Sequence, residues 1–527
     1  MNPAFPTPSI GKRIHFENTD ADSMSRHVGL WRLSPQSRLW LVGGLVSGTL
    51  LYAIFLFIGS DVPITTVLCA AWVVAWTAVA VAGGFQTVTG WFAFFPLFHF
   101  MLFALPLKVL VWEPAQSRLL APVSTPLSML LFYSGLLAAV FLVRLLKIGG
   151  RPVCVPGVAP SYYRWLAWVC YLMGTLAYFV AQFGSKDGGQ SGGGGLGVAS
   201  ILLQFQNLSI AAYIFYGWKL GINVWKRPAL WLFILSGLAL GVLASQKSGT
   251  AMPLVYILLA VWGTRGARAF KVIGPALILF GALFAGVLYP VMHYARGVEG
   301  VRGGSLSERA SLLQSILISY VTDAKFRKYM KEEVDKYAND RVITYLPESA
   351  GVFDRFLMIG NSDLLIAGVD HSAKSERFHG FELFTLGLEL SVPRILYPAK
   401  PEEGSSEYLA DVAGTRNVNQ KTYPTWGWPS ELYYSFGLPG VLVCTFLLQF
   451  GFLAMLNLWF GGKIRQSVWF CMLIPTLHFA NSCTAIDSLP ITLIPFFIVS
   501  ALLSKFCNVV SAPSPHLSAL RTVRIGE

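Results

Sequence analysis

Long apolar stretches recur along this chain, and they constrain its fold more than any other feature. A helix needs about 20 mostly apolar residues to cross the roughly 30 Å hydrocarbon core of a bilayer. The 527 residues are 54% hydrophobic and 13% charged, too apolar for a soluble surface. Twelve such stretches begin near Leu39, Val62, Trp91, Leu127, Trp165, Ala199, Ala229, Ala251, Val272, Leu438, Val468 and Leu489. We therefore expect an all-α polytopic membrane protein of about 12 transmembrane helices.

Apolar continuity fails over one long segment, residues 292–435. Periodicity in 306–338 and 354–367 predicts helices there, and 381–396 mixes polar and apolar residues as a helix lying on the membrane surface does. We expect a large, mostly helical loop domain before the last three spans. The expected order is an N-terminal segment 1–38, spans 1–9 in 39–291, the loop domain 292–435, spans 10–12 in 436–505 and a tail 506–527.

The net charge of +13 is concentrated in short connections between apolar stretches. The loop domain has 16 Lys and Arg against 19 Asp and Glu, whereas the rest of the chain has 24 against 8. Alternate connections are basic, as the positive-inside rule predicts for cytoplasmic loops. We expect both termini in the cytoplasm, the large loop outside, a lipid bilayer as partner and no nucleic acid. The first apolar stretch lacks a cleavage pattern, so we expect a retained anchor.

Seven cysteines are scattered, mostly within apolar stretches, and none has the CxxC spacing of a metal or redox site. We expect them to be small packing residues. The cysteines therefore predict no metal or redox site.

One candidate site is the line VPRILYPAKP, residues 392–401. Its prolines stiffen the backbone and would hold Arg394 and Lys400 near one point outside the bilayer. Such a pair suits a pyrophosphate, which Arg grips bidentately and Lys attracts as a compact charge. The alternative is a proline-rich loop whose cations pair with Glu402 and Glu403.

A second candidate is WGWPSELYYSFGLPG, residues 426–440, which leads into the tenth expected span. It puts Glu431 near a helix start at the membrane surface, among aromatic residues that any interface belt contains. Partial burial against an apolar wall would make this carboxylate a proton acceptor. The alternative is a residue that caps its own helix.

Together these two stretches resemble the Wzy-type O-antigen and exopolysaccharide repeat-unit polymerases. The likeness lies in a PR-x-hydrophobic-x-P-x-KP line followed by E-L-Y-x-x-F-G-x-x-G, here Glu431 to Gly440, and in a late large loop before the last helices. The resemblance implies a GT-C-like, metal-independent glycosyltransferase without a cofactor in the bacterial inner membrane. Donor and acceptor would be undecaprenyl-pyrophosphate-linked oligosaccharides at its periplasmic face, and a chain-length regulator would be a partner.

Other cations are candidates for the same pyrophosphate. Arg296 and Arg302 flank glycines that allow close approach of a phosphate, and Arg355 opens an apolar segment. Lys247 matches the S-x-R/K-(S)-G turn of related polymerases and ligases, although Lys cannot bind bidentately as Arg does. Each of these residues could instead snorkel or form a salt bridge.

Ligases of the superfamily use a loop histidine, so His379 is the second candidate base after Glu431. Two other functions stay open. One is a ligase that moves finished polymer to another lipid acceptor, and the other is a flippase for the same lipid-linked sugar. Transporters tend to have internal repeats and midplane charges, whereas this sequence has no evident repeat, few charges inside the expected spans and one large outer loop that alternating access would not need.

Overall fold

A computed structural model gives the fold of the chain, and every element among its described residues is a helix. The described residues are 33–148, 152–154, 157, 159–183, 195–243, 247–266, 268–295, 298, 306–339, 345–346, 357–371, 379–392, 397, 399, 405–415, 426–461, 467–480 and 486–511. In these ranges the expected all-α architecture is confirmed.

Each of the twelve apolar stretches overlaps a helix. Six helical segments in the described residues are long and apolar enough to cross a membrane: α2 (Pro35–Phe57), α3 (Val62–Val81), Val88–Leu110, α6 (Ser124–Leu145), α18 (Trp428–Phe460) and Leu493–Ser511. The remaining apolar stretches overlap α7 (Pro160–Phe183), α8 (Gly195–Leu220), α9 (Pro228–Leu243), α10 (Lys247–Arg265), α11 (Arg268–Leu283) and α19 (Val468–Ala480). A membrane-spanning helical fold is thus supported, while the count of twelve spans stays a prediction.

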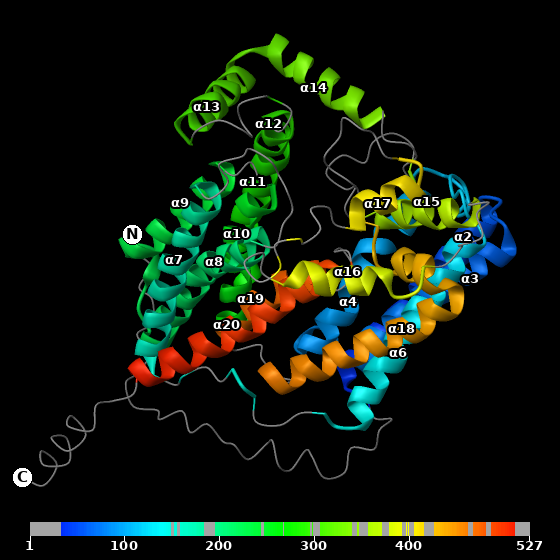
Figure 1. Cartoon of the computed structure of the whole chain (residues 1–527), viewed down its shortest axis with the longest axis horizontal. Coiled ribbons are helices and arrows are strands. Elements are labelled where there is room, and N and C mark those ends of the chain that lie inside the picture. The colour runs from blue at the N-terminus through cyan, green and yellow to red at the C-terminus, as the bar shows by residue number, and fades with distance from the viewer. Residues whose placement is uncertain are drawn as a thin grey trace, which may run out of the picture.

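The long helices form two neighbouring groups (Figure 1). One group contains α2, α3, α6 and α18 together with α4 (Val88–Phe100) and α5 (Ala104–Leu110). The other contains α7 to α11, and α19 and α20 (Ser488–Ser511) connect the groups because α19 packs on α4 and α20 on α7. Close approach depends on small residues, as in other membrane helices: a Cβ on Gly135 of α6 would lie 2.7 Å from the Leu442 carbonyl oxygen of α18.

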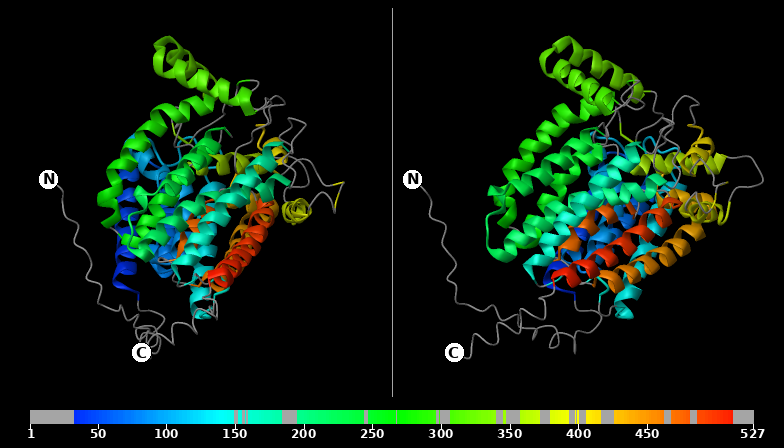
Figure 2. Two further views of the ribbon diagram at one scale, coloured as in Figure 1. Left: turned by 90° about the vertical axis from the view of Figure 1, so that its left-hand side faces the viewer. Right: turned by 60° about the vertical axis from the view of Figure 1, so that its left-hand side comes forward.

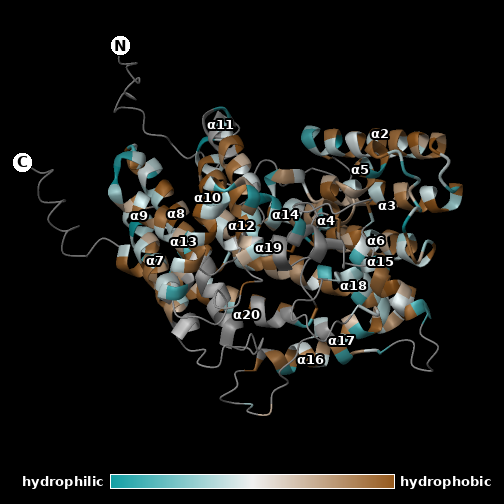
Figure 3. Cartoon of the chain, turned by 90° about the horizontal axis from the view of Figure 1, so that it is seen from above, coloured by the Kyte–Doolittle hydropathy of each residue, from teal (hydrophilic) through white to brown (hydrophobic). Residues whose placement is uncertain are grey.

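Large apolar side chains lie exposed on the outer faces of these helices, as expected where lipid is the solvent. Leu39 and Phe57 of α2 are 71% and 79% exposed, and Ile278 of α11 is 75% exposed. Figure 3 shows apolar residues predominating along α2 and α3. A soluble monomer would not leave such rows of side chains in water.

Five helices, here called the loop helices, lie in the expected loop domain: α13 (Leu306–Thr322), α14 (Ala324–Asn339), α15 (Met358–His371), α16 (Glu382–Ser391) and α17 (Ser405–Val412). The helical periodicity predicted over 306–338 is present but is divided at Asp323, whose Oδ1 accepts the backbone N–H of Lys325. α13 and α14 stand beyond the end of α12 (Tyr289–Ala295), at one end of the bundle, in every view (Figures 1 and 2).

The helix expected to begin at residue 436 begins instead at Trp428, because α18 continues through a break. Gly437 at this break has φ 69° and ψ −167°, a backbone conformation that residues with a side chain rarely adopt. The turns before Gly437 therefore belong to the helix rather than to the loop. They form a short helical extension that contacts α15.

The two ends of the bundle differ in what covers them. α15 and α16 lie at the start of α18 and α20, whereas the backbone N–H groups of Val153 and Cys154 donate to carbonyl groups at the far end of α18.

The described cysteines behave as packing residues, as expected: of six, five are buried and Cys444 is half-buried.

Candidate functional site

Glu431 occupies the first turn of α18, and its side chain is completely buried. Its Oε2 accepts a hydrogen bond from the backbone N–H of Ile486, at 2.7 Å. The N-cap residue of α18 is Gly427, and no side chain caps this helix end. The carboxylate therefore reaches across to the segment before α20, and it also interacts with the backbone N–H of Gly427, so the helix-cap alternative stays open.

The second carboxylate oxygen of Glu431, Oε1, has no hydrogen-bond partner among the described residues. A buried carboxylate oxygen without a donor costs free energy unless a proton, a ligand or another group satisfies it. Another buried carboxylate, that of Asp487, lies close enough to interact with Glu431 electrostatically. Its Oδ2 accepts the backbone N–H of Ser405, the first residue of α17, at 2.8 Å. Two buried acids thus meet where α17, α18 and α20 begin.

His379 is attached to the same end of α18. The backbone N–H of His379 donates to the Tyr434 carbonyl at 3.3 Å, and that of Gly380 donates to the Ser435 carbonyl at 2.7 Å. The imidazole stacks on the Tyr434 ring, with centroids 4.5 Å apart and an 8° angle between the planes. Its Nδ1 lies 3.3 Å from Oε2 of Glu382.

Tyr434 follows Glu431 by three residues on the same helix, so the structure brings both candidate bases to one short helical segment. Residues i and i+3 share a helix face. The ring of Tyr408, from α17, meets the rings of both His379 and Tyr434 edge-on, at 6.2 and 6.1 Å. The His379 side chain is 20% exposed, so it reaches solvent while Glu431 does not.

Two aspartates that the sequence analysis missed attach α15 to the long apolar helices. Asp363 is buried, and its carboxylate accepts from the N–H groups of Leu120 and Ala121 at 2.7 and 3.1 Å and from the Thr125 hydroxyl at 2.8 Å. These donors lie at the start of α6, which otherwise has no side-chain cap. Burial raises the pKa of the Asp363 carboxyl above its usual range, although the three donors oppose this effect.

Asp370 lies two turns further along α15. Its Oδ2 accepts from the Ser124 hydroxyl and its Oδ1 from the Tyr433 hydroxyl, both at 2.6 Å. Asp363 and Asp370 therefore fix one loop helix against α6 and against the helical segment that holds Glu431. A signal was present in the sequence, since two carboxylates seven residues apart interrupt an otherwise apolar helical segment.

None of the predicted pyrophosphate-binding cations has a described side chain. Arg296, Arg302, Arg355, Arg394 and Lys400 lie outside the described residues. Lys247 is the first residue of α10, and its side chain also lies outside the described part. The pyrophosphate clamp therefore stays a prediction. In the sequence, Arg394 follows the last residue of α16 by three positions, and α16 packs against Asp487 through Gly387.

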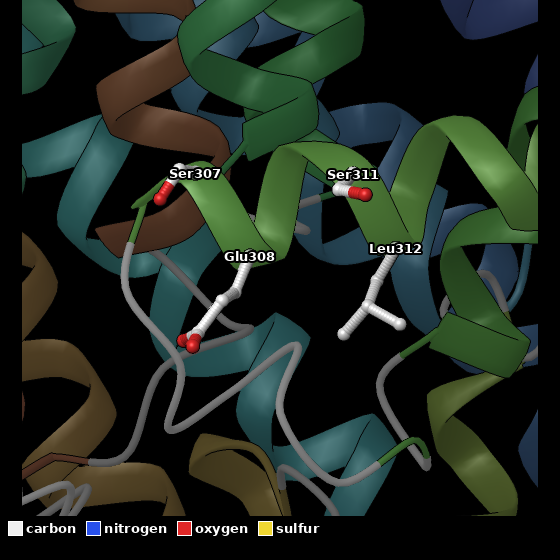
Figure 4. A pocket seen from close by; sticks show the side chains of 4 residues that line it. All are labelled: Ser307, Glu308, Ser311 and Leu312. Carbon is white, nitrogen blue, oxygen red and sulfur yellow. The ribbon is translucent and has the colours of Figure 1, made fainter.

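A wide hollow of about 590 Å³ lies along α13 and is lined by Ser307, Glu308, Ser311 and Leu312. Figure 4 shows Glu308 and Leu312 pointing to the same side of this helix. The hollow has a single charged group among these lining residues and is formed by a different helix from those around Glu431. It is not part of the candidate site.

No protein-family model, no protein of curated function and no solved structure matches this chain.

Proposed function

We propose that this protein is a membrane glycosyltransferase that polymerises oligosaccharide repeat units carried on undecaprenyl pyrophosphate at the periplasmic face of the bacterial inner membrane. The observation that carries the proposal is the buried Glu431 carboxylate, which has one oxygen held by Ile486 and the other without a described donor. A general base needs a carboxylate that is held in place and still has a free acceptor oxygen. The resemblance of the PRILYPAKP and ELYYSFG stretches to repeat-unit polymerases supports the same assignment.

In the proposed reaction, Glu431 takes the proton from a sugar hydroxyl of the acceptor. The acceptor oxygen then forms a bond to the anomeric carbon of the donor, and the bond from that carbon to the pyrophosphate oxygen breaks. Undecaprenyl pyrophosphate leaves with the electron pair of the broken bond. Arg394 and Lys400, with Arg296, Arg302, Arg355 and Lys247 as further candidates, would stabilise the charge of the leaving group.

The surroundings of Glu431 suit such a step because helices from distant parts of the chain hold them in place. α15 is fixed to α6 and α18 through Asp363 and Asp370, and α17 to the start of α20 through Asp487. Positioning groups that are themselves hydrogen-bonded maintain the geometry that acid–base catalysis requires. His379 is the second candidate base, because its imidazole is partly exposed on the neighbouring Tyr434.

The decisive experiment uses the purified full-length chain in detergent with an undecaprenyl-pyrophosphate-linked oligosaccharide. We expect longer lipid-linked products on a gel, and we expect Glu431→Gln to lose them. Glu332→Gln, which changes an exposed carboxylate of α14, is the matched control and should keep them. Transfer only to a different lipid acceptor would instead identify a ligase. Vesicles in which the sugar changes sides without growing in length would identify a flippase.

A further inference from the structure

A pocket of about 270 Å³ lies where α7 begins, α8 ends and α9 begins. It is lined by Arg164, Trp168, Tyr213, Tyr216, Ile222 and Arg227. Its volume is roughly that of nine water molecules. This is the end of the bundle opposite the loop helices, because α7 begins beside the end of α20. The charge distribution in the sequence predicts that this end faces the cytoplasm.

The two arginines give the pocket its charge. Neither guanidinium contacts a carboxylate in the part of the chain that the structure describes, and both side chains are exposed. α7 and α9 both have their N-terminal ends here, and the partial positive charge of a helix N-terminus adds to that of the arginines. Lys219, in the last turn of α8, lies 5.1 Å from the Trp218 ring and offsets the negative end of that helix.

Local sequence signals build this pocket. Gly221 ends α8 in the left-handed conformation, with φ 66°, and the N–H of Ile222 donates back to the Gly217 carbonyl. The chain then turns through Asn223, whose Oδ1 accepts the N–H of Trp225. Arg227 comes two residues after Trp225 and immediately before Pro228. Pro228 is the first residue of α9, and proline favours the first position of a helix. The turn thus places Ile222 and Arg227 opposite the start of α7.

The side chains below the pocket are apolar and face outward. On α7, Trp168, Leu172 and Leu176 follow Arg164 at intervals of four residues. Trp168 lines the pocket, and the side chains of Leu172 and Leu176 are 62% and 65% exposed. On α9, Leu235 is 59% exposed. Residues four apart form a continuous row on a helix, so a cationic pocket leads directly onto an apolar surface.

We infer that this pocket binds the headgroup phosphate of an anionic membrane phospholipid whose acyl chains lie along the α7 row. Two arginines can hold a phosphodiester through charge-assisted hydrogen bonds, and tyrosine and tryptophan side chains favour the headgroup level of a membrane. Basic pockets between transmembrane helices on the cytoplasmic side bind anionic headgroups in this way. The apolar row favours a lipid over a free phosphate, because only a lipid would also cover Leu172 and Leu176. The inference does not depend on the proposed glycosyltransferase activity.

The test is a titration of the delipidated, detergent-purified full-length protein with phosphatidylglycerol, followed by native mass spectrometry. We expect saturable binding, and we expect the double variant Arg164→Gln/Arg227→Gln to weaken it roughly thirtyfold. Lys226→Gln removes a neighbouring exposed charge that does not line the pocket, and it should change the affinity less than threefold. Ile222→Trp keeps both arginines and should also weaken binding because the indole fills the pocket.

Three results would overturn the inference. The first is a double variant that binds phosphatidylglycerol within threefold of the wild type. The second is phosphatidylcholine binding as tightly as phosphatidylglycerol, because a neutral headgroup would then suffice. The third is inorganic phosphate displacing the lipid at micromolar concentration, which would identify a site for the free anion.

Discussion

The Glu431 carboxylate and the backbone N–H of Ile486 are joined by a 2.7 Å hydrogen bond across 55 residues of sequence. Through this bond the start of α18 is connected to the segment that precedes α20. A single side chain therefore both fastens two helices together and offers an acceptor oxygen that no described group occupies. These two roles can be separated by substitution.

Glu431→Gln should abolish elongation with little loss of stability. The glutamine carbonyl oxygen can still accept from Ile486, but the amide cannot take a proton from a sugar hydroxyl. We expect the elongation rate to fall by about 10²–10⁴ and the free energy of unfolding to change by less than about 1 kcal/mol. Elongation assays and thermal unfolding in detergent measure the two effects. Wild-type elongation by a folded Glu431→Gln protein would contradict the assigned role.

Asp363→Asn should destabilise the attachment of α15 to α6. One of the three donors to Asp363 would then face an amide NH₂ group instead of an oxygen. Leaving a buried donor unsatisfied costs about 1–3 kcal/mol. Glu332→Gln on α14, where the carboxylate is 65% exposed, is the control and should cost less than about 1 kcal/mol. Equal unfolding temperatures for the two variants would argue against this attachment.

The stability conferred by Asp363 should also depend on pH. Because burial raises the pKa of this carboxyl above its usual 3.8, the folded state binds the proton more tightly than the unfolded state does. The contribution of Asp363 to the free energy of unfolding therefore falls as the pH rises from about 3.8 through the folded-state pKa, and it changes no further above that. The stability difference between the wild type and Asp363→Asn should decrease over this range in denaturant titrations. A difference that grows with pH would reverse the assigned direction.

Gly135→Ala should loosen the packing of α6 on α18. The new methyl group would lie 2.7 Å from the Leu442 carbonyl oxygen and 3.1 Å from the Phe446 nitrogen, so the helices must separate. Overpacking of this kind costs about 1–3 kcal/mol, which outweighs the gain in helix propensity of up to about 1 kcal/mol. Gly451→Ala on α18 meets no atom within 4 Å and should be neutral or stabilising. Unfolding temperatures of the two variants give the comparison.

Lys108 and Glu113 should tolerate substitution unequally. The Lys108 ammonium is fully buried, 2.6 Å from Oε2 of Glu113 and 4.6 Å from the centre of the Tyr345 ring. Glu113 is 21% exposed and also lies 3.3 Å from Arg118, so it keeps water and a partner if the lysine is removed. We expect Glu113→Gln to cost about 3 kcal/mol and Lys108→Met about 1–2 kcal/mol in thermal unfolding. The opposite order would show that the lysine charge is compensated elsewhere.

Periodicity and hydropathy predicted the positions of most helices because each apolar helix leaves a local signal. The start of α18 was placed too late, since the predicted span began at residue 436, near the start of the apolar stretch, whereas the helix begins at Trp428 and continues through a break at Gly437. Glu431 and His379 were both named as candidates from a motif or from their residue type. That they share one helical segment depends on backbone hydrogen bonds between residues 379–380 and 434–435, which no local pattern indicates.

Asp363 illustrates why the remaining contacts could not be predicted. Its donors lie about 240 positions earlier in the chain, at the start of α6, and two of them are backbone N–H groups that carry no residue-specific signal. In the sequence, a carboxylate within an apolar helix suggests only that it has a partner. Identifying the partner requires the tertiary arrangement.

The burial of the described cysteines has a practical consequence for studies of this protein. Thiol reagents that stay in water should react slowly with Cys69, Cys154, Cys170, Cys471 and Cys507 in the folded protein. In a variant that lacks Cys444 and Cys483, a cysteine introduced at Glu332 of α14 would therefore give a strong labelling signal, as would one at Lys226 beside α9. Labelling intact cells and opened vesicles with a reagent that cannot cross lipid would then report directly on which compartment each position faces.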